Sequence, residues 1–273
     1  LLCMPTYAAV YLAAGSPAQP TPAMLAWGAW AAILLAVGVP SAIAAAFLAR
    51  LGHLLGLGER TAIVVALGWG LGSMALPYAT LLYGNQLAAS LTIVAFTRLV
   101  ECRDQRRATP SQMLTVGALL GFAGATEYPA MLIVAALGVY ALRIVGFRAS
   151  LWAVAGAAIP LAALLLYPRT AFGSPLAFPY DYSVWNEPKT GWFMGISAPV
   201  AASLRNILWG EYRGLLYTTP WLALAAPGAF VLARRHRPEA IVCAWAIVSF
   251  LWLNASIPPW HGGWAAGPRY LVP

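Results

Sequence analysis

The chain has 273 residues, of which 61% are hydrophobic and only 9% are charged, and its net charge is +8. Soluble domains carry about 25% charged residues, so this composition excludes an ordinary water-facing surface and indicates an integral membrane protein. The positive charge does not indicate a nucleic-acid partner, because the arginines fall between apolar runs and no basic stretch is interleaved with stacking aromatics.

Several apolar runs approach the length needed to cross about 30 Å of hydrocarbon. In chain order they cover residues 23–49, 61–78, 84–100, 111–126, 128–147, 151–167, 214–233 and 240–256. No alternating pattern of about ten residues recurs between turns, which disfavours a membrane β-barrel and leaves helices as the spanning elements. The sequence therefore predicts an all-α, polytopic transmembrane helix bundle of about eight spans, with residues 1–273 in a single transmembrane domain.

Positive charges gather in alternate connections between these runs. Eleven of the sixteen lie on one side: Arg50, Arg60, Arg98, Arg103, Arg106, Arg107, Arg143, Arg148, Arg234, Arg235 and Arg237. The positive-inside rule makes that side cytoplasmic. The carboxylates of Glu59, Glu101, Asp104 and Glu239 share this side, and we expect them to balance arginines.

Two glycine pairs and one long connection complete the organisation. The G-x-x-x-G pairs Gly68/Gly72 and Gly117/Gly121 predict close packing between helices. Residues 168–213 form the only long connection, which this topology makes an extracytoplasmic loop. Its second part, about residues 198–212, has leucines and isoleucine at helical spacing, which predicts an interfacial helix on the membrane surface.

Cysteine spacing gives no sign of a disulfide or a zinc site. Cys3, Cys102 and Cys243 are far apart, and they show neither a plausible disulfide partner nor the spacing of metal ligands. We name no cofactor, and we leave a divalent metal ion open because no ligand set for one is visible.

The outer-side carboxylates mark two candidate positions. Glu127 stands in "GATEYPAML", at a tight turn between two helices, where it either lines a site or is a turn residue paired with an arginine. Tyr180, Asp181 and Tyr182 stand in "FPYDYSVWNEP". Aromatic faces with a carboxylate suit sugar rings, although tyrosines at this position also fit an aromatic belt at headgroup depth.

The last residues, "PPWHGGWAAGPRYLVP", emerge on the same side as "PYDY". Glycines let a backbone approach a ligand closely, and Trp260 is placed for the membrane interface. His261 is either a proton carrier or a solvated side chain. Arg269 either contacts a phosphate through its guanidinium fork or extends to the interface.

These residues resemble motifs of a known family. "PPWHGGWAAGPRYLVP", with its Trp, Gly pair and Gly-Pro-Arg-Tyr, is similar to a segment of bacterial relatives of the protein O-mannosyltransferases and the lipid A aminoarabinose transferases. Those proteins are polytopic GT-C glycosyltransferases. "LLCMPTYAAVYLAAG", "ATEYPAML" and "FGSPLAFPYDY" also resemble family segments.

The resemblance implies transfer of a sugar from a polyprenyl-phosphate donor to a hydroxyl of a lipid, glycan or protein, with inversion, at the outer face of the bacterial cytoplasmic membrane. The family's catalytic Asp lies in a first outer loop that would precede Leu1, so no catalytic residue is expected here, and we interpret the chain as an internal fragment. Lys189, Arg213 and Arg269 are the candidates to stabilise the leaving phosphate. The alternatives are a transporter or flippase for a lipid or glycan, and a non-catalytic assembly protein.

Overall fold

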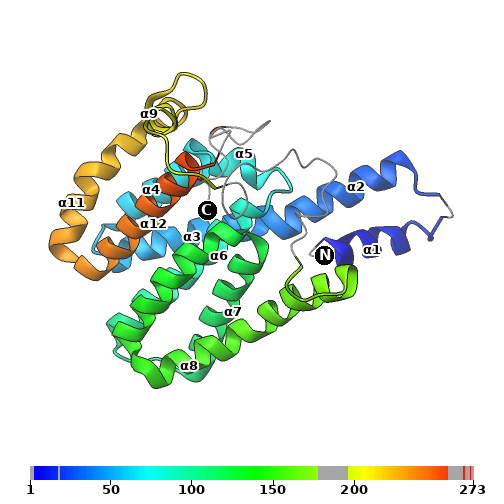
Figure 1. Ribbon diagram of the computed structural model, residues 1–273, viewed down its shortest axis with the longest axis horizontal. Helices are drawn as coiled ribbons and strands as arrows, with labels where there is room; N and C mark the ends of the chain where they lie inside the picture. Colours follow the sequence, from blue (N-terminus) through cyan, green and yellow to red (C-terminus); the bar gives the residue numbers. More distant parts are fainter. Residues whose placement is uncertain (1–2, 18, 178–195, 258–266, 268–270, 272–273) are drawn as a thin grey trace.

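The computed structural model describes residues 3–17, 19–177, 196–257, 267 and 271. Helix is the only regular structure in these residues, which confirms the all-α prediction for them. Figure 1 shows a helical bundle from which α1 (Met4–Ala13) and α2 (Pro22–Ile33) extend as an arm. The other elements, in chain order, are η1 (Leu34–Gly38), α3 (Val39–Leu54), α4 (Glu59–Gly72), α5 (Ala75–Ala79), α6 (Gly84–Gln105), α7 (Pro110–Thr126), η2 (Tyr128–Ala130), α8 (Met131–Phe172), α9 (Ala201–Trp209), α10 (Leu215–Thr218), η5 (Pro220–Leu224), α11 (Ala225–Arg235) and α12 (Arg237–Ala255).

Three helical stretches of the described residues are long and apolar enough to cross a membrane. They are Pro22–Leu54, Tyr128–Phe172 and Arg237–Ala255. This finding supports membrane association, but it does not support the predicted count of eight spans. The other apolar runs form helices that are shorter or less apolar than a spanning helix requires.

Two of the predicted runs are broken. Run 61–78 is interrupted at Ser73, whose extended backbone separates α4 from α5. Run 214–233 is divided among α10, η5 and α11, because Pro220, which begins η5 one residue after α10, has no backbone N–H with which to continue the helix. Neither run is therefore one continuous spanning helix.

Two other predicted runs form one bent helix. Run 128–147 covers η2 and the first half of α8, and run 151–167 lies in the second half of α8. The backbone departs from helix at Gly146, near the end of the first run, with φ 79° and ψ 171°. That conformation is open essentially only to glycine, which explains why the bend falls there. Figure 1 shows the two halves of α8 diverging from this bend.

A π-helical turn, η1, joins α2 to α3 in one continuous stretch. The Val39 N–H donates to the Leu34 carbonyl, five residues back, just before Pro40, which has no N–H to donate. The Ser41 hydroxyl donates to the Val37 carbonyl at 2.8 Å and accepts from Gln86 Nε2 at 3.1 Å. This buried contact holds α6 against the π-helical turn η1.

The main core surrounds α6, which packs against α3, α7 and α8. Its buried members include Leu51 of α3, Leu99 and Val100 of α6, Val116 of α7, Leu137 of α8, and Val242 and Phe250 of α12. The core thus connects helices from both halves of the chain.

Glycines set the closest helix contact. A Cβ on Gly117 would lie 1.8 Å from the Ala153 carbonyl oxygen, and one on Gly156 would lie 2.1 Å from the Leu114 carbonyl oxygen. A Cβ on Gly121 would lie 2.7 Å from the Pro160 ring. The prediction that Gly117 and Gly121 permit close packing is therefore confirmed, and the partner is the second half of α8. The other pair, Gly68 and Gly72, faces the Trp221 ring instead.

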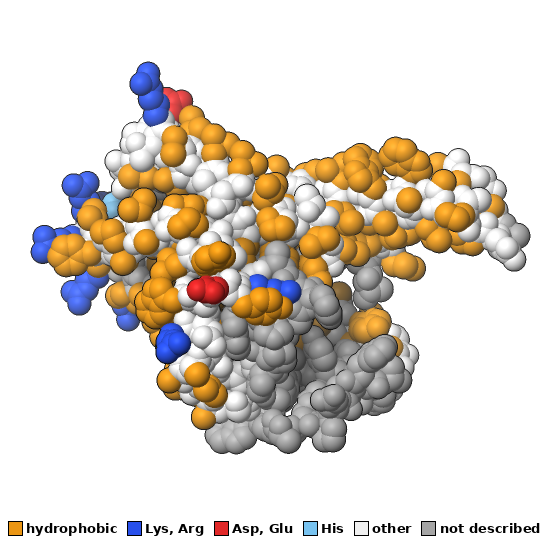
Figure 2. Space-filling view, turned by 90° about the horizontal axis from the view of Figure 1, so that it is seen from above, with side chains coloured by type: hydrophobic (Ala, Val, Ile, Leu, Met, Phe, Trp, Pro, Cys, Tyr) orange, Lys and Arg blue, Asp and Glu red, His pale blue; other side chains and the backbone are white. Residues whose placement is uncertain are grey.

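Large apolar side chains cover much of the molecule's surface. Figure 2 shows hydrophobic side chains over most of the described surface in that view, while Lys and Arg gather towards one end. Phe147, Val154 and Ile159 of α8 are examples of exposed apolar residues. A surface of this kind requires acyl chains or further protein to cover it.

Candidate functional site

Among the described residues, carboxylates lie at both ends of α6. We call the first the arginine end: it holds the Glu101 and Glu239 carboxylates with Arg50, Arg98 and Arg103. We call the second the Glu127 end: it holds Glu127, Gly84, Met74 and Gly267. The α6 helix runs from the second to the first, because Gly84 begins it and Glu101 and Arg103 lie in its last turns.

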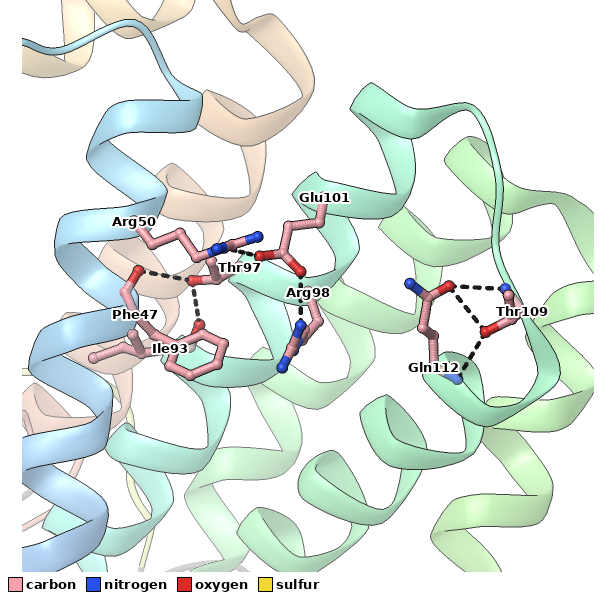
Figure 3. Close-up of polar contacts among 8 residues, drawn as sticks. All are labelled: Phe47, Arg50, Ile93, Thr97, Arg98, Glu101, Thr109 and Gln112. Atoms are coloured by element: carbon pink, nitrogen blue, oxygen red, sulfur yellow. Dashed lines mark hydrogen bonds and ion pairs between the residues drawn. The ribbon is translucent and has the colours of Figure 1, made fainter.

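At the arginine end, Glu101 is buried and accepts from two arginines. Arg98 Nη1 donates to Oε2 at 3.0 Å, and Arg50 Nε of α3 donates to Oε1 (Figure 3). The Arg98 guanidinium also lies 5.0 Å from the centroid of the Phe47 ring. These contacts join the ends of α3 and α6.

Glu239 of α12 is completely buried at the same end. Its Oε1 accepts from Arg103 Nη1 at 2.5 Å and from the Tyr140 hydroxyl of α8. Its Oε2 has no hydrogen-bond partner in the part of the chain that the structure describes. Arg103 also pairs with Asp104 at 2.7 Å. One carboxylate therefore ties α6, α8 and α12 together.

The pKa of Arg103 reflects these contacts. Burial alone would lower it, but the hydrogen bond to Asp104 and the charge and hydrogen bond of Glu239 raise it above its ordinary value. Arg103 therefore stays cationic. The expectation that Glu101, Asp104 and Glu239 balance arginines is confirmed, and these carboxylates serve the structure of the bundle.

At the Glu127 end, the predicted site residue Glu127 follows directly on α7. Its Oε1 lies 2.5 Å from the position that a Cβ on Gly84 would occupy. Only glycine leaves room for the carboxylate there. The carboxylate thus lies at the first residue of α6, where the helix dipole favours a negative charge.

The motif glycine Gly267 lies at the same end. It is buried with φ 65°, and a Cβ on it would lie 2.1 Å from Met74 Sδ. Met74 begins the segment that contains α5, where the buried Tyr78 ring meets the Tyr83 ring edge-on at 5.6 Å. That segment runs from Met74 beside Gly267 to Gly84 beside Glu127, so the structure brings the two sequence-selected stretches to one end of the bundle.

A pocket of about 260 Å³ lies one to two helical turns from Glu127. It opens between α1, η1, α6 and α7. Its lining residues are Thr6, Leu35, Ala36, Leu87, Leu91 and Phe122. Since Thr6 supplies the only polar side chain among them, the pocket suits a hydrocarbon chain.

The predicted interfacial segment 198–212 contains a helix, α9 (Ala201–Trp209), so the expectation of a helix is confirmed. The segment before α9 forms backbone hydrogen bonds with the end of α12. Ser197 N donates to the Ser256 carbonyl at 2.8 Å, and Val200 N donates to the Ala255 carbonyl at 3.1 Å. Arg213, after α9, has φ 66°, and its guanidinium lies 4.7 Å from the Tyr212 ring centroid.

Seven of the predicted site residues lie outside the residues that the structure describes. They are Tyr180, Asp181, Tyr182, Lys189, Trp260, His261 and Arg269. Their roles stay predictions.

Two buried polar residues, Asn254 and Thr219, were not selected from the sequence. Asn254, in the last turn of α12, is fully buried, and neither atom of its amide has a hydrogen-bond partner among the described residues. Thr219, between α10 and η5, is also buried with an unpartnered hydroxyl. No sequence signal separates them from other polar residues at helix ends, because burial depends on the packing around them.

The described residues contain no group of three His, Cys, Asp or Glu side chains that could hold a metal ion. Comparison with known proteins gives no match to any family model, to any curated protein or to any solved structure. The functional assignment therefore depends on the residues themselves.

Proposed function

We propose that this chain is part of a bacterial membrane glycosyltransferase of the GT-C type, which transfers a sugar from a polyprenyl-phosphate donor to an acceptor hydroxyl at the outer face of the cytoplasmic membrane. The main support is that Gly267, from the motif "WHGGWAAGPRY", and Glu127, from "ATEYPAML", lie at the same end of α6, opposite the arginines. One described residue from each of these two motifs therefore lies at this end.

We further propose a polytopic arrangement of about eight crossings, several of them by helices too short to span without tilt or a local thinning of the bilayer. The crossings are α2 with α3, α4 with α5, α6, α7, the two halves of α8, α11 and α12. Support comes from the arginine end, where Arg50, Arg98, Arg103 and Glu239, from three different connections, converge. The positive-inside rule then orients the Glu127 end outward.

In the proposed reaction, the acceptor hydroxyl oxygen attacks the anomeric carbon and the bond from that carbon to the phosphate oxygen breaks. A carboxylate that acts as general base takes the hydroxyl proton. Arg269, with Lys189 and Arg213, stabilises the charge that develops on the leaving phosphate. The apolar pocket beside Leu87 and Phe122 accommodates part of the polyprenyl chain.

The role of Arg269 gives the first prediction. A charge-assisted hydrogen bond contributes about 1.5–3 kcal/mol, so Arg269→Ala in the full-length protein should slow transfer by about tenfold to a hundredfold. Arg269→Lys should also be costly, because the bidentate fork is lost. The measurement is transfer by purified protein from a lipid-linked donor.

Arg205→Ala is the matched control, since Arg205 is an exposed arginine of α9 on the same predicted side. It should leave transfer nearly unchanged. Near-normal rates in both Arg269 variants would remove Arg269 from the site, and an inert wild-type protein with every lipid-linked donor would remove the enzymatic proposal itself.

The topology gives the second prediction. In a variant without Cys3, Cys102 and Cys243, single cysteines near Lys189 and Gly263 should react in intact cells with a membrane-impermeant thiol reagent. A cysteine at Arg106 should react only after permeabilisation. The opposite labelling pattern would reverse the proposed orientation and place the Glu127 end in the cytoplasm.

A further inference from the structure

The corner between α11 and α12 carries three arginines within four residues. Arg234 and Arg235 end α11, and Arg237 begins α12; we call these three residues the α11–α12 tip. All three side chains are exposed. Figure 1 shows α11 at the edge of the bundle, and Figure 2 shows blue side chains gathered on that same side of the view.

No ion pair is found between the tip and a carboxylate of the described residues. The predicted cytoplasmic side carries eleven arginines and four carboxylates, a surplus of seven positive charges. The carboxylates of Glu101, Asp104 and Glu239 pair with Arg50, Arg98 and Arg103. Within the described part of the chain, no acidic side chain forms an ion pair with the tip.

The helices that lead to the tip expose apolar faces. No residue of α11 is buried, and Phe230 and Val231 are exposed one turn from the arginines. The Arg234 guanidinium lies 4.2 Å from the Phe230 ring centroid. On α12, Ile241 and Val248 are also exposed. The cationic side chains therefore lie directly beside an apolar surface. A lipid has the same arrangement, with a charged headgroup next to its acyl chains.

We propose that the α11–α12 tip binds the headgroups of anionic phospholipids, with the exposed faces of α11 and α12 in contact with their acyl chains. Guanidinium groups match phosphate oxygens in bidentate geometry and are weakly hydrated, which favours transfer from water to a phosphate layer. The apolar faces beside the tip favour a lipid over a free phosphate, because a free phosphate has no hydrocarbon to cover them. A lipid is also favoured over an acidic protein, because α12, which begins at the tip, is long and apolar enough to cross a membrane.

The test reconstitutes the full chain in vesicles with equal amounts of phosphatidylglycerol and phosphatidylcholine. Native mass spectrometry after gentle extraction then counts the lipids retained on the protein. The wild type should retain mainly phosphatidylglycerol. Since each arginine near an anionic surface contributes an increment, Arg234→Gln with Arg235→Gln should lower the preference for phosphatidylglycerol by about tenfold to fiftyfold. Arg237 is kept so that the start of α12 is not disturbed.

Two controls separate headgroup binding from total charge and from folding. Arg169→Gln with Arg205→Gln removes the same charge from exposed positions at other helices and should leave the preference intact. Arg234→Lys with Arg235→Lys keeps the charge and should retain most of the preference for phosphatidylglycerol. Equal retention of both lipids by the wild type, an undiminished preference in the double Gln variant, or the same loss in the Arg169/Arg205 variant would each overturn the proposal.

Discussion

Replacement of Gly117 by Val should prevent α7 from packing on α8 and should abolish the native fold or lower its stability by about 3 kcal/mol or more. Even the first carbon of the side chain would lie 1.8 Å from the Ala153 carbonyl oxygen. That neighbour is backbone in the middle of a helix, and Gly156 makes the reciprocal contact with Leu114. The two helices would therefore have to separate along the whole contact. Thermal unfolding of detergent-purified protein, followed by size-exclusion chromatography, measures the loss.

Gly138 provides the matched control. It is also a glycine inside a helix of the bundle, but a Cβ on it meets no atom within 4 Å. Gly138→Ala should be neutral or slightly stabilising, because alanine has the higher helix propensity. If Gly117→Val melted at the wild-type temperature, the close contact between α7 and α8 would not exist as described.

Removal of Arg103 should be the most damaging single change at the arginine end. Glu239 is completely buried, and Arg103 is the one cation that pairs with it among the described residues. Deleting one partner of a buried pair leaves an uncompensated charge and costs about 3–5 kcal/mol. Arg103→Gln should therefore lower the melting temperature strongly, while Arg106→Gln, at an exposed position without an acidic partner in the described ranges, should change it little.

A second substitution distinguishes charge burial from lost packing. In Arg103→Gln with Glu239→Gln, the buried group is neutral and can still accept from the Tyr140 hydroxyl. Most of the stability should return, because replacing both charged partners avoids the desolvation cost of an unpaired ion. A double variant no more stable than Arg103→Gln alone would show that the arginine contributes mainly through packing.

The candidate site could be predicted from the sequence only in part. Glu127 was selected because a carboxylate at a helix turn in an apolar chain is costly, and the structure does place it at an end of the bundle with Gly267. Its neighbour Gly84 was not selected, since nothing in "LLYGNQ" indicates that a carboxylate distant in sequence approaches it. The unpartnered amide of Asn254 was missed for the same reason.

The sequence by itself determined the helical secondary structure and the apolar composition that suits a membrane, and it located the arginines between the apolar runs. Each of these depends on composition or on the position of charges along the chain, and neither requires knowledge of which helices pack together. It also located the close helix contact at Gly117 and Gly121, because small residues one turn apart mark such contacts wherever their partner lies.

The tertiary structure decided which elements meet. Faces that contact lipid and faces that contact helices are both apolar here, so hydrophobic periodicity could not assign partners. The pairing of Arg103 with Glu239 joins residues separated by 136 positions, and only packing of α6, α8 and α12 brings them within 2.5 Å. Backbone chemistry decided where the apolar runs bend or break. Gly146 forms the bend of α8, the one helix that contains two predicted spans. Pro220 divides another predicted span.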